Sequence, residues 1–78
     1  MARPRARPDQ VPTRERILAA AARSFAAHGL AHATLAEIAA AAGIRRPSLL
    51  YHFATKDELY EAVVRRAFDQ LGRELAAA

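Results

Sequence analysis

Residues 34–53 read Thr-Leu-Ala-Glu-Ile-Ala-Ala-Ala-Ala-Gly-Ile-Arg-Arg-Pro-Ser-Leu-Leu-Tyr-His-Phe. The first half of this stretch predicts a short helix, because Thr34 and Glu37 form a capping box and Gly43 is typical of a helix end. The second half predicts another helix, since Pro47 fits only within a first turn, where its missing N–H is not needed. Two short helices joined by a turn that contains glycine are the pattern of a helix-turn-helix motif.

Two further helices are predicted on either side of this motif. The first begins with Thr13 as its N-cap and ends at Gly29, with apolar residues at every third or fourth position. The last follows a second capping box, formed by Thr55 and Glu58, and reaches the final residues of the chain. The sequence therefore predicts an all-α fold, a small homeodomain-like helix-turn-helix bundle of three helices plus a longer fourth helix.

The composition limits the size of the core and the class of protein. Of the 78 residues, 53% are hydrophobic, but 21 of those 41 residues are alanine, which favours helices and buries little area. The length allows one domain, and the absence of cysteine excludes a disulfide framework. There is neither an apolar run of about 20 residues nor a secretory signal. We expect a cytoplasmic protein with no membrane contact and no cofactor.

Positive charge gathers in two parts of the chain. Residues 1–16 hold five arginines against two acids, and residues 34–56 hold three cations against one acid, whereas residues 57–78 hold three arginines against five acids. Residues 1–12 carry three of the four prolines and predict a flexible basic tail. This polarity indicates an anionic partner at one end of the molecule, with ordinary surface charge as the alternative.

The second helix of a helix-turn-helix motif enters the DNA major groove with its N-terminal residues facing the base edges. Arginine there can donate twice to guanine, serine can pair with several base edges, and a proline ring can touch a thymine methyl group. The pattern therefore favours double-stranded DNA as the partner; solvated arginines with no ligand are the alternative. The residues at that position in this chain are Arg45, Arg46, Pro47 and Ser48.

The ordered spacing of these residues resembles the DNA-binding domain of the tetracycline-repressor (TetR) family, over roughly Thr13 to Phe68. That resemblance implies a transcriptional regulator, expected to be a repressor. It also implies a core formed by Ile38, Ala42, Ile44, Leu49, Phe53 and Leu59. The matching pattern is Thr34-x-x-x-Ile38-Ala39-x-x-Ala42-Gly43-Ile44, then Leu49-x-Tyr51-His52-Phe53, then Lys56-x-x-Leu59.

The resemblance also implies a set of DNA contacts. Thr34 and Lys56 correspond to phosphate contacts, and Tyr51 and His52 to contacts with the backbone or the groove wall. Thr34 is equally explained as a helix cap alone. The predicted DNA-binding residues are Thr34, Arg45, Arg46, Pro47, Ser48, Tyr51, His52 and Lys56.

Two positions depart from the family pattern. Arg45 stands where the family commonly has a serine or threonine cap, the loss of which typically costs about 1 kcal/mol. Leu50 stands where the family often has a tyrosine, and Tyr51 lies one residue later, about 100° around the helix. The usual phosphate-touching tyrosine is therefore either missing or replaced by Tyr51 from another angle.

Members of this family carry a larger C-terminal domain that binds an effector and forms the dimer. We expect residues 13–78 to be the helix-turn-helix domain alone, with that effector and dimerisation domain absent. The full-length regulator is then a homodimer on a palindromic operator, and this chain is monomeric or weakly associated. A truncated chain, a partial reading frame and a stand-alone DNA-binding module all agree with this pattern.

A rival hypothesis makes the chain a helical protein-interaction module. The fourth helix is apolar over a wider face than a three-helix core requires, so that face is either core or left open for a partner. Its residues include Val64, Phe68, Leu71 and Leu75. An enzyme is not expected, because the sequence offers no nucleophile–base set or glycine-rich phosphate loop. A metal site is not expected either, since Gly29 separates His28 from His32.

Overall fold

The computed structural model describes residues 11–77, and within this range the backbone forms four α-helices and no strand. The all-α prediction is confirmed, as is the order of three helices followed by a longer one. Residues 1–10, most of the predicted basic tail, and Ala78 lie outside the described residues. The helices are α1 (Thr13–His32), α2 (Leu35–Ala42), α3 (Arg46–His52) and α4 (Lys56–Ala77).

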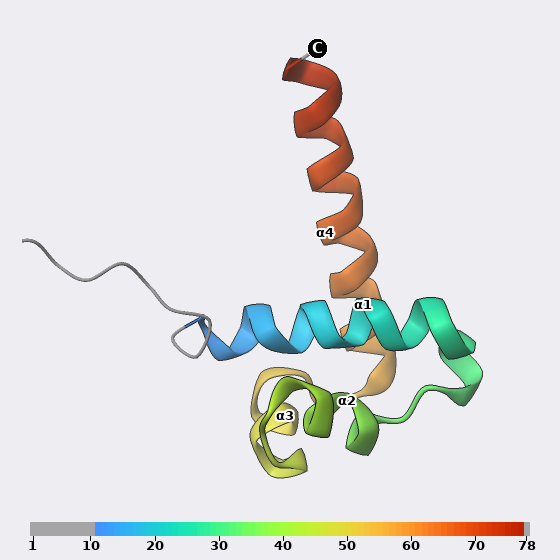
Figure 1. Ribbon diagram of the computed structural model, residues 1–78, viewed down its shortest axis with the longest axis vertical. Helices are drawn as coiled ribbons and strands as arrows, with labels where there is room; N and C mark the ends of the chain where they lie inside the picture. The colour runs from blue at the N-terminus through green and yellow to red at the C-terminus, as the bar shows by residue number, and fades with distance from the viewer. Residues whose placement is uncertain (1–10, 78) are drawn as a thin grey trace, which may run out of the picture.

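Figure 1 shows α1 lying across the molecule, with α2 and α3 together on one side of it. α4 starts on that same side, passes α1 and extends away from the other three helices. The main packing is of α1 against both α2 and α4, and of α2 against α3. Of the helices in residues 11–77, none combines the length and the apolarity needed to span a membrane.

α1 begins at Thr13, but Thr13 is not its cap. Pro12 occupies the N-cap position with extended backbone, and its carbonyl accepts from the Arg16 N–H at 3.1 Å. The predicted Thr13 cap is therefore wrong by one residue, because the proline carbonyl starts the helical ladder without needing a donor of its own. Gly29, with φ 79° and ψ 163°, breaks the regular helix where the sequence predicted its end.

The turn after α2 forms as predicted. The Thr34 hydroxyl oxygen accepts from the Glu37 N–H at 3.1 Å and caps the start of α2. Gly43 adopts the left-handed conformation, with φ 76° and ψ 28°. Its N–H donates to the Ala40 carbonyl, and the next N–H along the chain donates to the Ala39 carbonyl, both at 3.0 Å. This is a Schellman motif, which ends α2 sharply and turns the chain into α3.

The starts of α3 and α4 also agree with the predictions. α3 carries Pro47 in its first turn and ends at His52, with Phe53 as its C-cap. The Thr55 hydroxyl oxygen accepts from the Glu58 N–H at 3.1 Å, which is half of the second predicted capping box. The two short helices and the start of α4 are thus fixed by local signals.

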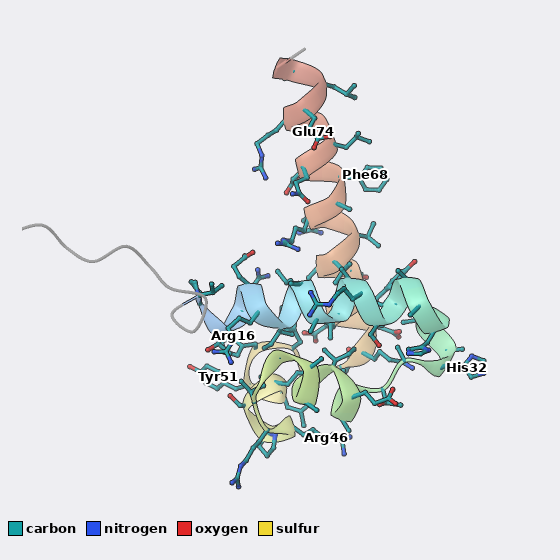
Figure 2. The ribbon with its side chains drawn as sticks, viewed as in Figure 1. Arg16, His32, Arg46, Tyr51, Phe68 and Glu74 are labelled. Atoms are coloured by element: carbon teal, nitrogen blue, oxygen red, sulfur yellow. The ribbon has the colours of Figure 1, made fainter. Side chains whose placement is uncertain are left out.

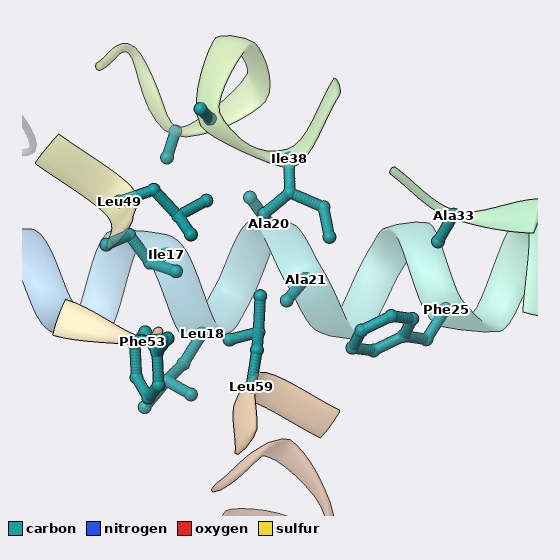
Figure 3. Close-up of a cluster of buried hydrophobic side chains, with 12 residues drawn as sticks. Ile17, Leu18, Ala20, Ala21, Phe25, Ala33, Ile38, Leu49, Phe53 and Leu59 are labelled. Atoms are coloured by element: carbon teal, nitrogen blue, oxygen red, sulfur yellow. The ribbon is translucent and has the colours of Figure 1, made fainter. Parts of the chain in front are cut away.

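The core lies where α1 passes the other three helices (Figure 3). Five of its twelve buried residues are alanines, which allow the helices to approach closely. Five of the six residues assigned to the core by resemblance are buried. The sixth, Ile44, is half-buried and packs against the edge of the cluster. The buried residues are Ile17, Leu18, Ala20, Ala21, Phe25, Ala33, Ile38, Ala39, Ala42, Leu49, Phe53 and Leu59.

Candidate nucleic-acid interface

α3 is anchored on one side and open on the other. Leu49 is completely buried, and Phe53, just after the helix, is 4% exposed, so these two side chains hold α3 in the core. Residues 45–48 are all exposed. Figure 2 shows Arg46 at the opposite end of the molecule from Phe68 on α4. The four residues predicted to read bases thus form one continuous exposed run at the amino end of α3.

Arg45 occupies the N-cap position of α3 and makes no side-chain capping bond. Its carbonyl accepts from the N–H groups of Ser48 at 3.0 Å and Leu49 at 3.2 Å, which closes the first turn. A guanidinium group can donate but cannot accept, so it does not replace the usual serine or threonine cap. The amino end of α3 therefore keeps its positive partial charge beside two arginines, an arrangement that favours an anionic ligand.

Tyr51 is the most exposed of the large hydrophobic side chains in the described range, at 86%. Its ring meets the half-buried His52 ring edge-on, with the centroids 5.2 Å apart. Leu50, at the position where the family often has tyrosine, is 37% exposed. The phenol available on this part of α3 is therefore that of Tyr51, in a position to reach a ligand outside the molecule.

Thr34 lies at the start of α2 and is exposed. Its hydroxyl oxygen is already the acceptor that caps the Glu37 N–H. A hydroxyl group has one O–H donor as well as its acceptor lone pairs, so the cap leaves the proton available. The structural role and the predicted phosphate contact are therefore compatible at this residue.

Lys56 has contacts that the sequence does not predict. Its Nζ donates to the Ala33 carbonyl at 2.9 Å and lies 3.5 Å from the Ala31 carbonyl. These bonds tie the first residue of α4 to the segment that joins α1 to α2. An ammonium group has three donors, so one remains for the predicted phosphate contact. The side chain is held near the start of α2, the same region as Thr34.

Two arginines near the start of α1 also make contacts that the sequence does not predict. The Arg16 Nη2 donates to the Ala42 carbonyl at the end of α2, at 2.7 Å. The Arg14 guanidinium lies over the Phe53 ring, 5.1 Å from its centroid. Neither contact has a local sequence signal, because the partners lie more than 25 residues away in the chain.

The outer half of α4 is exposed and carries an apolar stripe among charged residues. Phe68 is 68% exposed, Leu71 50% and Leu75 69%, so the outer part of the predicted stripe is an open face rather than core. Val64, nearer to α1, is half-buried. Nearer to α1, Tyr60 packs edge-on against Phe25, with the ring centroids 5.3 Å apart. The apolar face therefore continues outward from the core along α4.

Comparison with known proteins identifies the family. Residues 17–63 match the family described as bacterial regulatory proteins, tetR family. The chain is 36% identical over 63 residues to the HTH-type transcriptional repressor BepR of Brucella suis, covering 81% of this chain and 30% of that protein. It is 41% identical over 68 residues to the HTH-type transcriptional activator FasR of Mycolicibacterium smegmatis, covering 83% of this chain and 31% of FasR.

A solved structure is similar over almost the whole chain. It is a TetR-like transcriptional regulator from Rhodococcus sp. RHA1, with a TM-score of 0.82 and 30% identity, covering 97% of this chain and 39% of that one. The chain spans about a third of the length of these relatives, which are named as transcriptional regulators. With residues 17–63 matching the family model and the helix-turn-helix geometry in place, this chain belongs to the TetR family of bacterial regulatory proteins.

Proposed function

We propose that this chain binds double-stranded DNA in a sequence-specific manner, as the reader domain of a TetR-family transcriptional regulator. The observation that carries the proposal is the asymmetry of α3. Leu49 is completely buried, while Arg45–Ser48, the N-cap and first turn of α3, are exposed. A short helix that is held in the core by Leu49 and presents two arginines at its exposed amino end is suited to insertion into a major groove.

In this mechanism the two arginines and Ser48 contact base edges, and Pro47 packs against a thymine methyl group. Thr34 and Lys56 contact phosphates from the starts of α2 and α4, and Tyr51 and His52 contact the groove wall. The phosphate contacts set the register of the domain, and the base contacts set its sequence preference. The proposed division of roles therefore predicts different mutational effects for the two groups.

Two copies of the domain would read the two halves of a palindromic operator. We place the regulator in the cytoplasm, where it meets the chromosome, and assign it as a repressor, because occupancy of a promoter blocks transcription without further contacts. The BepR relative is named a repressor, while FasR is named an activator. An in vitro transcription assay with the selected site inside a promoter tests this assignment. A rise in transcript would contradict it.

DNA binding is tested by selecting duplexes from a random library with the 78-residue chain and titrating the enriched duplex by fluorescence anisotropy at two salt concentrations. A single domain contacts one half-site, so we expect weak binding, with a Kd close to the non-specific range of about 10⁻⁴–10⁻⁶ M at physiological salt, and tighter binding at low salt. Absence of binding at low salt, or affinity that does not change with salt, would contradict the proposal.

The second candidate function is a helical protein-interaction module, which the exposure of Phe68, Leu71 and Leu75 favours. Such a module loses its partner when Phe68 and Leu75 are replaced by serine, and it is indifferent to Arg46→Ala. The DNA reader behaves in the opposite way. Measuring both variants in the same DNA titration and in a size-exclusion assay of complex formation separates the two functions.

A further inference from the structure

We propose that Arg16 is a positioning residue for DNA recognition, which holds the turn between α2 and α3 and so sets where the amino end of α3 lies. The inference rests on the proposed function, because it concerns the same interface. Arg16 itself is in α1, is half-buried, and is outside the set of residues that would contact bases.

The first observation is the bond from Arg16 to the end of α2. The guanidinium Nη2 donates to the Ala42 carbonyl at 2.7 Å. Carbonyls at the end of a helix carry partial negative charge, and a cationic donor makes the bond stronger than a neutral one. The backbone of the turn uses the carbonyls of Ala39 and Ala40, so Arg16 satisfies a carbonyl that the Schellman motif leaves free.

The second observation is the close approach of Arg16 to Gly43. A Cβ atom added at Gly43 would lie 2.9 Å from the Arg16 Nη2, closer than real Cβ contacts occur. Gly43 also has φ 76°, which L side chains rarely adopt. Glycine therefore serves two purposes here, because it permits the backbone conformation and gives Arg16 room to lie against the turn.

The third observation is how little else holds the amino end of α3. Residues 45–48 are exposed, Ile44 is only half-buried, and the first fully buried anchor on α3 is Leu49. Arg16 bonds to the chain just before this poorly anchored stretch, and it does so from a different helix. Hydrogen bonds to base edges weaken steeply with distance and angle, so a small shift of the turn is enough to impair base reading while the core stays packed.

The test compares Arg16→Gln with the matched control Arg23→Gln. Arg23 lies two turns further along α1, is exposed, and loses the same single charge. Each variant of the 78-residue chain is titrated against the duplex enriched by the unmodified chain and against a scrambled duplex of equal composition. The ratio of the two affinities is the readout, because a change in the folded fraction lowers both affinities equally and cancels.

We expect the affinity ratio to fall by about tenfold in Arg16→Gln, the order of a lost base contact, and to stay unchanged in Arg23→Gln. Gly43→Ala should lower the ratio in the same direction, since it strains the left-handed backbone of the turn and displaces the guanidinium from it. An unchanged ratio in Arg16→Gln would overturn the proposal. An equal loss on both duplexes is one form of that result, and if the salt dependence also falls by about one phosphate contact, it makes Arg16 a phosphate ligand. Failure of the proposed function gives a distinct result, in which the unmodified chain enriches no sequence.

Discussion

The amino end of α3 and the outer half of α4 are both exposed, but their chemistry is opposite. Residues 45–48 present two arginines, a proline and a serine directly beside the buried anchor Leu49. Residues 68–75 present Phe68 and two leucines, at least 50% exposed, on a helix that has already left the core. A charged end next to a buried side chain suits an anionic ligand, whereas an exposed apolar stripe suits a protein surface. We therefore expect substitutions at Leu49 to change stability, substitutions at residues 45–48 to change DNA binding, and substitutions at residues 68–75 to change contacts with other proteins.

Replacing two leucines, one buried and one exposed, should change stability by very different amounts. Leu49→Ala removes a completely buried side chain and should cost about 2–5 kcal/mol of unfolding free energy, enough to unfold much of a domain of this size. Leu75→Ala changes a side chain that is 69% exposed and should alter stability by less than about 0.5 kcal/mol. Urea unfolding followed by circular dichroism measures both. A comparable loss in Leu75→Ala would mean that the outer half of α4 is buried in solution.

The next contrast concerns two exposed arginines. Arg46→Ala should weaken binding to the selected duplex by about tenfold or more and relax its sequence preference, because a guanidinium donating twice to guanine is lost. Arg73→Ala, an exposed residue on α4, should leave the affinity almost unchanged. Anisotropy titrations of both variants test this. Equal losses of affinity in the two variants would show that binding depends on the net charge of the chain rather than on contacts from α3.

Two matched helix caps provide a finer comparison. Thr34 and Thr55 each accept from a backbone N–H three residues later, both at 3.1 Å. Alanine at either position should therefore cost about 1 kcal/mol of stability. After correction for the folded fraction, only Thr34→Ala should weaken DNA binding, since only Thr34 is assigned a phosphate. If the two corrected affinities are equal, Thr34 is a cap and nothing more.

The smallest expected effect concerns two tyrosine hydroxyls. Tyr51→Phe should weaken DNA binding by about threefold, because a net hydrogen bond contributes about 0.5–1.5 kcal/mol. Tyr60→Phe, on α4, should have no effect on affinity. Adding Leu50→Tyr to the Tyr51→Phe chain then reports which position is used. Recovery of affinity beyond that of the unmodified chain would show that Tyr51 is not a substitute for the usual tyrosine.

Much of the fold could be predicted because its signals are local. Each signal acts within a few residues of its own position. The structure has helix caps at Thr34 and Thr55, a left-handed turn at Gly43 and a first helical turn at Pro47, as the sequence predicts. The predicted N-cap of α1 was wrong by one residue, because the Pro12 carbonyl replaces a side-chain cap. The predicted DNA contacts remain predictions, although their exposed or half-buried positions leave them accessible.

The contacts that hold the candidate interface could not be predicted in this way. The bonds from Arg16 to Ala42 and from Lys56 to Ala33 join residues 26 and 23 positions apart, so they depend on how the helices pack. Periodicity also did not decide whether the α4 stripe is buried, since the same pattern fits a core face and an open one. The packing of α4 past α1 settles that question, and Phe68 is exposed.

Whether α3 is the DNA-reading helix can be tested by titrating the ¹⁵N-labelled 78-residue chain with the selected duplex and following the backbone amide shifts in NMR spectra. We expect the largest shift changes at the start of α2 and along residues 44–56. Amides of residues 68–75 should remain almost unmoved. Changes concentrated in residues 68–75, with α3 unaffected, would contradict the assignment of α3 as the DNA-reading helix.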